Sequence, residues 1–433
     1  MASDRYDYGL STHSAAARDA YVEGADAVLG AKPMPQKPLG RALDADPDFA
    51  LAWIALARSR FLEADVAGAR EAAARARALA EATTERERSH VDSIALAIEG
   101  KPVDALAATR AHLAEYPRDA MVLAPATGVF GLIGFSGRAQ REAELHEWLR
   151  SLEGHYGDDW WFGSMYAFAE CEVGQLESAH RRIESSLTAC ASNAHGVHVL
   201  AHVLYELGDP TAASQFLAGW LPGYERSGLL HCHLSWHAAM SALQLGRTDQ
   251  AWDYYRKGVH PGGSWGPPLN TVTDAPSFLW RAGLAGQAPE GDLWPQVHAY
   301  ALRSFPKVGV TFADVHVAIA CAAVDDQESL QRMIGELLDR LAGDRLPAGD
   351  GVPLLVEGFA LFARGRWNEA IARLETALAQ TVRIGGSRAQ RDIVDHTLLA
   401  AYLKAGREDD ARRLIARRID RHPVVKVAGI TAI

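Results

Sequence analysis

The stretch EVGQLESAH, residues 172–180, contains the pattern that decides the fold of this chain. A helical run ends at Gly174, and Ala179 follows inside a second helical run. Glycine can adopt the positive φ that closes a helix and reverses the chain, and a small alanine lets the returning helix approach closely. The same pair recurs at Gly100 with Ala105, Gly134 with Ala139, Gly208 with Ala213, Gly246 with Ala251, Gly365 with Ala370 and Gly406 with Ala411. The pattern predicts a helix–turn–helix unit that repeats along the chain.

The spacing of these glycines identifies the type of repeat. Successive intervals are 34, 40, 34, 38, 119 and 41 residues, and the long interval predicts two further turns, near Gly286 and Asp325. Helix–turn–helix units of this length are typical of tetratricopeptide repeats, which bury their apolar faces by stacking. We therefore predict an all-α solenoid of tetratricopeptide-type hairpins that forms a single, tightly wound superhelical domain.

The extent of the array follows from the same pattern. We expect roughly nine or ten hairpins over residues 14–422, with about 65% or more of the chain in helices. Residues 258–270 (GVHPGGSWGPPLN) contain too many Gly and Pro residues for a helix, so they predict an irregular loop over a pocket. A short extended tail is expected at 423–433.

Composition and charge exclude several classes of function. The formal net charge of −10 argues against a nucleic-acid or anionic-membrane surface, which needs a basic stripe. No stretch of about 18 uninterrupted apolar residues is present, and the N-terminal sequence does not resemble a secretory signal. The four cysteines are far apart and form no C-x-x-C pair. We therefore expect a cytoplasmic protein without a nucleic-acid or membrane partner.

Two histidine pairs are the first candidates for a functional site. His198 and His202 precede the turn at Gly208, and His233 and His237 precede the next turn at Gly246. Residues four apart lie on one face of a helix, and the first helix of each tetratricopeptide hairpin lines the concave surface. The two pairs should therefore face one another from neighbouring first helices.

The second set of candidates precedes the two inferred turns. Asp274 and Ser277 lie before the turn near Gly286, and Asp314 and His316 lie before the turn near Asp325. Polar residues thus recur at a similar position on successive first helices.

Three interpretations of these residues stay open. In the first, they are packed or surface residues hydrogen-bonded between first helices. In the second, imidazoles of the two pairs (His198, His202, His233 and His237) and a carboxylate bind a transition metal such as zinc or iron. In the third, His and Asp act as general base and acid on a small molecule. In the third interpretation Arg281 and Arg391 neutralise an anionic group of that molecule, and Trp236, Trp265 and Trp280 form walls of its pocket.

Many of these candidate residues lie in segments that resemble motifs of one known family. The run RIGGSRAQRD, residues 383–392, resembles a distinctive motif of the tetratricopeptide repeat protein 38 family, found in bacteria and animals. Three blocks also resemble family motifs: HGVHVLAH (195–202), CHLSWHAAM (232–240) and FADVHVAIA (312–320). The resemblance implies the α-solenoid, and it implies that the His, Asp and Arg positions matter as a set. It implies no settled reaction.

The 383–392 motif itself has two interpretations. Ser387, Gln390, Arg391 and Asp392 form a ligand-facing group if the last repeats curl back toward the histidines. The alternative is that these residues cap the start of their own helix and pair locally.

We expect an enzyme-like repeat protein that binds a small polar or anionic molecule, with His198, His202, His233, His237, Asp314 and His316 as catalytic candidates. Hydrolase or lyase/isomerase chemistry is favoured. The alternative is a non-catalytic scaffold for a protein or peptide partner, and a homo-oligomer stays open.

Overall fold

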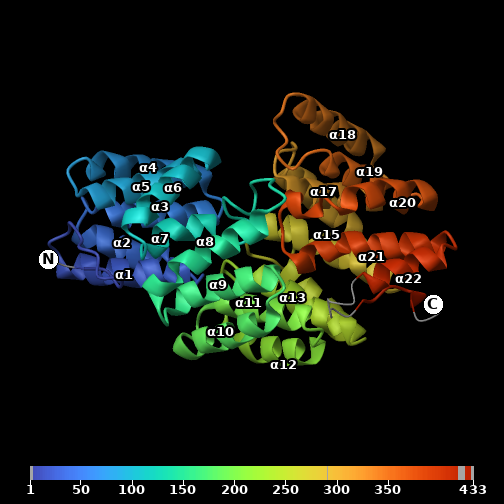
Figure 1. The fold of residues 1–433 in the computed structure, drawn as a ribbon, viewed down its shortest axis with the longest axis horizontal. Helices are drawn as coiled ribbons and strands as arrows, with labels where there is room; N and C mark the ends of the chain where they lie inside the picture. The colour runs from blue at the N-terminus through green and yellow to red at the C-terminus, as the bar shows by residue number, and fades with distance from the viewer. Residues whose placement is uncertain (1–2, 290, 418–424, 431–433) are drawn as a thin grey trace. The chain divides into compact units, whose positions relative to one another are not determined.

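A computed structural model describes residues 3–289, 291–417 and 425–430 of the chain. Helices make up 71% of these residues, and within the described ranges the only β pairing is an isolated bridge between Ser3 and Gly9. Twenty-two α-helices are present among the described residues, and apart from Ala120–Leu123 and Arg141–Tyr156, which no tight turn joins, they follow one another in ten helix–turn–helix pairs (Figure 1). The predicted all-α helical repeat is confirmed, and ten pairs lie within the nine or ten expected. None of the described helices is long and apolar enough to cross a membrane.

The chain divides into two compact units, each described here by itself. Unit 1 comprises residues 1–134, 143–199 and 227–230, and unit 2 comprises residues 135–142, 200–226 and 231–433. Helix α11 (Ala194–Glu206) begins in unit 1 and ends in unit 2.

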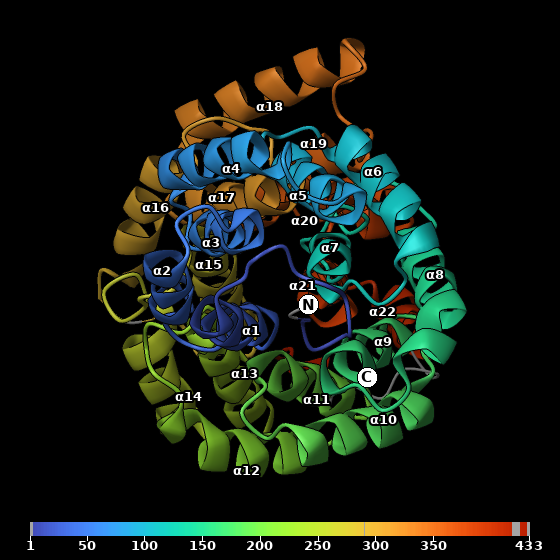
Figure 2. The same cartoon turned by 90° about the vertical axis from the view of Figure 1, so that its left-hand side faces the viewer.

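Unit 1 is built from alanine-rich helix pairs. Its helices are α1 (Ala15–Leu29), α2 (Gln36–Ala45), α3 (Ala50–Leu62), α4 (Val66–Ala80), α5 (Glu85–Ile98), α6 (Pro102–Glu115), α7 (Ala120–Leu123), most of α8 (Arg141–Tyr156), α9 (Trp160–Glu172) and α10 (Leu176–Ala189). Helix α3 packs against both α4 and α5, as the blue part of Figure 2 shows. Ala52, Ala55 and Ala69 are fully buried at these contacts, so the helix surfaces meet without intervening bulk.

Unit 2 contains the helices that carry most candidate site residues. They are α12 (Pro210–Trp220), α13 (His231–Gln244), α14 (Thr248–Tyr254), α15 (Pro268–Leu284), α16 (Leu293–Ser304), α17 (Thr311–Ala323), α18 (Gln327–Ala342), α19 (Gly351–Ala363), α20 (Trp367–Leu378), α21 (Arg388–Lys404) and α22 (Glu408–Ala416). The first helices of successive pairs pack in order, α13 on α15, α15 on α17 and α17 on α19. Helix α21 contacts α15 as well as α19, so the row of first helices in unit 2 curls back on itself (Figure 1).

The predicted turns are confirmed wherever a glycine is followed by the buried alanine. Helices break at Gly100, Gly174, Gly208, Gly246, Gly365 and Gly406, and all six have φ between 71° and 84°. The alanines five residues later are at most 2% exposed. The inferred turns are also present, with positive φ at Gly286 and Asp325.

The predicted turn at Gly134 is wrong. No helix covers residues 127–140, and the first helix of that pair, α7, has only four residues. Pro125 and the glycines at 128, 131, 134 and 137 disfavour a helix there, because proline lacks an N–H and each glycine loses much backbone entropy. A Cβ on Gly134 would lie 2.3 Å from the carbonyl oxygen of Val129, so the chain folds too tightly there for any side chain.

The predicted loop 258–270 is shorter than expected. A π-helical turn covers Tyr255–Val259, and α15 starts at Pro268, so residues 260–267 form the irregular segment. Proline is well tolerated at a helix start, where its missing N–H would have no partner. Within the predicted tail, the described residues 425–430 are attached by the Ala428 N–H, which donates to the Leu284 carbonyl at 2.8 Å. The C-terminal end of the predicted array, at 422, lies outside the described residues.

Two glycines with the same backbone conformation show how much of the destabilisation by a Gly→Ala substitution comes from steric crowding. Gly386 (φ 72°) and Gly406 (φ 71°) are both left-handed, but a Cβ on Gly386 would lie 2.3 Å from the Phe312 ring, whereas a Cβ on Gly406 meets nothing. We expect Gly406→Ala to lower the free energy of unfolding by about 1–2 kcal/mol, from backbone strain alone. Gly386→Ala should cost about 1–3 kcal/mol more, from overpacking. Equal losses in urea denaturation would show that the contact with Phe312 is not tight.

Candidate functional site

Three imidazoles from two neighbouring first helices form a compact cluster in unit 2. His237 Nε2 on α13 lies 3.2 Å from His202 Nε2 on α11. The ring centroid of His233 is 4.8 Å from that of His237 and 6.1 Å from that of His202. All three side chains are at most 5% exposed. We call His202, His233 and His237 the histidine cluster.

An aspartate and a tryptophan fix the orientation of His233. Its Nδ1–H donates to the Asp274 carboxylate on α15 at 2.8 Å. On the other side, the His233 ring stacks on Trp236, with centroids 5.3 Å apart and an angle of 7° between the planes. When Nδ1–H donates to a carboxylate, Nε2 is the unprotonated nitrogen of a neutral imidazole. Trp236 therefore supports the histidine ring, which refines its predicted role as a pocket wall.

The cluster is a poor place for positive charge. Burial lowers the pKa of His202 well below its usual value, and His233 lowers it further. Burial likewise lowers the pKa of His237, with smaller contributions from His202, His233 and Arg281. These two imidazoles are therefore neutral at pH 7.

Arg281 on α15 is a buried cation beside the cluster. Its Nη2 donates to the carbonyl oxygens of Ala389 and Gln390, at 2.7 and 3.0 Å, and its guanidinium lies 5.7 Å from the centre of the Trp236 ring. Its Nε and Nη1 are buried and have no hydrogen-bond partner among the described residues. The side chain is 2% exposed, and it forms no ion pair with any described carboxylate. Ser277, one turn earlier on α15, also has a buried hydroxyl without a partner among the described residues.

The two candidates on α17 have different surroundings. His316 Nδ1–H donates to the Phe312 carbonyl at 2.8 Å, and its pKa falls to about 4 because it is buried, with Arg281 contributing. His316 thus belongs to the surroundings of Arg281. The Asp314 carboxylate instead accepts from the Gly309 N–H, at 3.0 and 3.2 Å. Residues two apart on a helix do not share a face, and the two side chains accordingly have different partners.

The 383–392 motif meets the histidine region through Arg281 and also caps its own helix. Ser387 and Gln390 form a capping box at the start of α21. Arg391 donates to the Gly386 carbonyl and pairs with Glu142, whereas Asp392 accepts from the Tyr205 hydroxyl of α11 at 3.0 Å. The motif is therefore largely structural at Ser387, Gln390 and Arg391. The curl of α21 toward α15 and α11 agrees with the tightly wound arrangement expected for this part of the chain.

His198 lies one turn before His202 on the same helix, in the part of α11 that belongs to unit 1. Its ring packs against Phe168 of unit 1, with centroids 5.6 Å apart. The expectation that the two residues share one helical face rests on this spacing and stays a prediction.

A second buried polar cluster, in unit 1, was missed as a set. One oxygen of Asp119 accepts from Arg86 Nη1 at 2.9 Å, from His90 Nδ1 at 2.8 Å and from His112 Nε2 at 3.1 Å. Burial alone would raise the pKa of Asp119, but His90 and the donated hydrogen bonds outweigh it and lower the pKa well below its usual range. The position of His90 before the Gly100 turn indicated that it lies on a first helix with the other polar candidates. His112 lies on a second helix, so its position in the sequence did not indicate that it belongs to this cluster.

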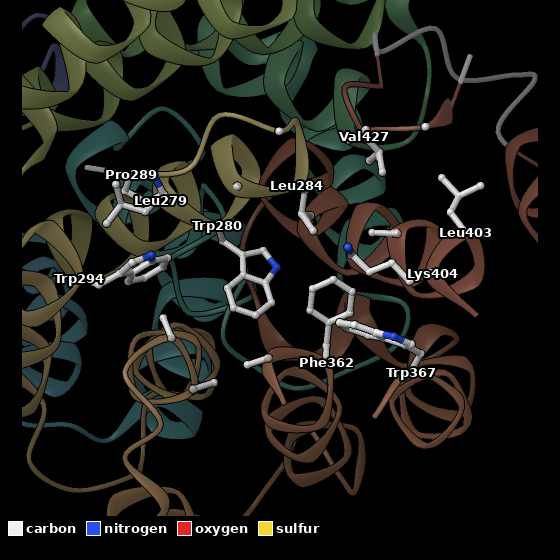
Figure 3. Close-up of a pocket in the computed structure, with 18 residues that line it drawn as sticks. Leu279, Trp280, Leu284, Pro289, Trp294, Phe362, Trp367, Leu403, Lys404 and Val427 are labelled. Carbon is white, nitrogen blue, oxygen red and sulfur yellow. The ribbon is translucent and has the colours of Figure 1, made fainter. Parts of the chain in front are cut away.

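An open apolar pocket lies elsewhere in unit 2, as Figure 3 shows. Its volume is about 640 Å³, and its walls include Trp280, Trp294, Phe362 and Trp367. Lys404 stands at its edge, with Nζ 5.3 Å from the centre of the Trp367 ring. The sequence suggested only Trp280 of these four as a pocket wall, because aromatic residues on a helix are usually core.

Comparison with known proteins supports no functional assignment. No family model matches the chain. Similar solved structures include yeast Tom70, with 14% identity over 94% of this chain and 92% of that chain (TM-score 0.36). They also include the P58(IPK) TPR domain, with 15% identity over 93% and 99% (TM-score 0.24). A chain of Naa15/Naa10 bound to HypK-THB is 14% identical over 93% of this chain and 63% of its own length (TM-score 0.22). Similarities this weak carry no argument about function.

Asp314 provides a pH test with a defined sign. Burial raises its pKa to about 7, although Gly309 and Arg340 oppose the shift. Between the unfolded value near 3.8 and this folded value, the folded chain keeps a proton that the unfolded chain has lost, so the free energy of unfolding falls as pH rises. We expect Asp314→Asn to raise it by about 1–3 kcal/mol at pH 8 and to change it little at pH 4.

Urea denaturation at pH 4, 6 and 8 measures this effect, with the exposed Asp253→Asn as control. If Asp314→Asn leaves the pH dependence of unfolding between pH 4 and 7 unchanged, the carboxyl group does not titrate in this range.

Proposed function

We propose that this tetratricopeptide-type repeat protein is enzyme-like and binds a small anionic molecule, with a carboxylate or phosphate group, at Arg281 in unit 2. The observation that supports this proposal is the buried guanidinium with two N–H groups that have no partner among the described residues. A buried cation without a counter-charge destabilises the fold, and a bound anion would remove this cost. Arginine suits carboxylate and phosphate groups, because its planar fork can donate two parallel hydrogen bonds.

The neighbouring side chains provide acid–base chemistry for such a molecule. His233, oriented by Asp274, is a candidate to accept or donate a proton, in the way that a carboxylate-oriented imidazole acts as general base. His316 near Arg281 is a second candidate. Proton transfer beside an anionic group fits the hydrolase and lyase/isomerase classes favoured by the sequence. The resemblance to the tetratricopeptide repeat protein 38 family agrees with this proposal, since its matching blocks include His202, His233 and His316.

Arg281→Met separates binding from stability. We expect calorimetric affinity for the best anion in a panel of small carboxylates and phosphates to fall by about 10–100-fold, the equivalent of 1.5–3 kcal/mol for a charge-assisted contact. The free energy of unfolding without ligand should stay equal or rise by up to about 2 kcal/mol, because a buried charge is removed.

Arg281→Lys should recover only part of the affinity, since an ammonium group cannot form the planar fork. Arg412→Gln, at an exposed ion pair on α22, is the control and should change neither quantity. A loss of stability beyond about 2 kcal/mol in Arg281→Met, with anion binding intact, would make Arg281 a structural residue.

A specific observation favours a second candidate function, a scaffold for a peptide partner. The apolar pocket at Trp280, Trp294, Phe362 and Trp367 is within the size range of ligand sites, and Lys404 adds a positive charge at its edge. These features fit a peptide with an aromatic or leucine anchor next to an acidic residue.

Selection of a displayed 12-residue peptide library against the whole chain tests this second candidate. We expect enriched peptides to combine an apolar anchor with an acidic residue and to lose at least about tenfold in affinity for Trp367→Ala. Trp265→Ala is the matched control, because Trp265 is 65% exposed and lies outside the pocket. Enriched peptides that bind Trp367→Ala unchanged would exclude the pocket as their site.

A further inference from the structure

The positions of three imidazole nitrogens match the spacing of ligands around one metal ion. Ligand nitrogens on a tetrahedral zinc ion lie about 3.3 Å apart, given Zn–N bonds of about 2.0–2.1 Å. His202 Nε2 and His237 Nε2 lie 3.2 Å apart, and the ligand atoms available on His202, His233 and His237 all lie within 4.8 Å of one another. Small rotations of the rings would bring them to one centre.

The surroundings of His233 match those of metal-bound histidines. Metal-ligating imidazoles usually donate their other N–H to a carboxylate or carbonyl, which fixes the tautomer and turns the remaining lone pair toward the metal. Asp274 accepts from His233 Nδ1 at 2.8 Å, and stacking on Trp236 limits rotation of the ring. A core histidine that only fills space does not need both restraints.

The number and type of ligands indicate the class of ion. Imidazole suits zinc, copper, nickel and iron, and catalytic zinc sites usually have three protein ligands and an open fourth position. We propose that His202, His233 and His237 together bind one divalent transition metal ion of the zinc class. The proposal rests on the proposed function in one respect: the anion held at Arg281 would supply a further ligand to the metal. With His233 bound to the metal, His316 near Arg281 would be the group that transfers a proton.

Arg281 places a condition on this site. A guanidinium and a divalent cation repel one another, and both lie in a buried region where screening by water is weak. An anion that contacts both would convert this repulsion into two attractions. Metal affinity should therefore rise when the anion is present, and by linkage anion affinity should rise by the same factor when the metal is present.

The experiment uses the full chain without a histidine tag, stripped with EDTA and titrated with Co²⁺, whose intense visible absorption reports tetrahedral binding. We expect one Co²⁺ displaced by Zn²⁺, a loss of affinity above about 100-fold in His202→Gln and His237→Gln, and a loss of about 10–100-fold in Asp274→Asn. His298→Gln is the matched control, because it removes an imidazole from a separate candidate group with Cys321 and Asp326.

A direct readout avoids reliance on variants that fail to fold. X-ray absorption on the wild-type chain with one equivalent of Zn²⁺ should show nitrogen ligands at about 2.0 Å with the outer-shell scattering of three imidazoles. Absence of Co²⁺ binding to the wild type, sulfur ligation, or Co²⁺ affinity lost in His298→Gln but kept in His237→Gln would each overturn the proposal.

Anion binding measured in EDTA keeps the two proposals apart. If Arg281-dependent anion binding persists in EDTA while His202→Gln and His237→Gln leave Co²⁺ binding unchanged, the metal proposal fails and the proposed function stands. If Co²⁺ binds through the cluster but Arg281→Met leaves anion binding unchanged, the proposed function fails and the metal site stands.

Discussion

The close approach of paired helices at each glycine turn is the constraint on which the rest of the structure depends. A left-handed glycine reverses the chain, and the alanine five residues later is buried at 2% exposure or less, so the two helices meet at their backbones. Each such pair buries a modest apolar area, and stability accumulates as pairs stack. The first helices of successive pairs then pack on one another as well as on their partners. Almost every residue of α13 and α15 is buried as a result.

Because first helices are buried on several sides, each polar residue on them loses hydration free energy. The two units compensate for this loss differently. In unit 1, one oxygen of Asp119 receives hydrogen bonds from Arg86, His90 and His112. That network satisfies its central charge within the chain, as expected of a structural element. In unit 2, Asp274 is paired with His233, but Arg281 keeps two buried N–H groups without partners among the described residues. The fold thus supplies three hydrogen-bond donors to Asp119, but it leaves two N–H groups of Arg281 without acceptors among the described residues, beside His202 and His237. That contrast is a physical reason to assign function to unit 2.

The sequence predicted features that depend on local chemistry, and missed those that depend on distant partners. Turn glycines at Gly100, Gly208 and Gly406 were correct, because a left-handed residue between two helical runs has few alternatives. Gly134 had the same spacing, but the predicted turn there was wrong, since Pro125, Gly128 and Gly131 disfavour a helix on its N-terminal side. The histidine pairs could be placed on helix faces by spacing alone. The Glu142 partner of Arg391 and the Tyr205 partner of Asp392 could not, because each pair is separated by more than 180 residues.

Charge also explains why the metal and the anion would belong to one site. Imidazole binds a metal ion as the neutral ring, so three histidine ligands would leave a bound divalent cation with its full charge. Asp274 is the carboxylate that contacts the cluster directly among the described residues, and its hydrogen bond to His233 can offset only part of that charge. Arg281 adds a further positive charge nearby. A site with this balance would bind a cation weakly by itself and strongly with an anionic partner. The residues that make binding of the cation alone electrostatically unfavourable would therefore make the doubly occupied site selective for an anionic small molecule over a neutral one.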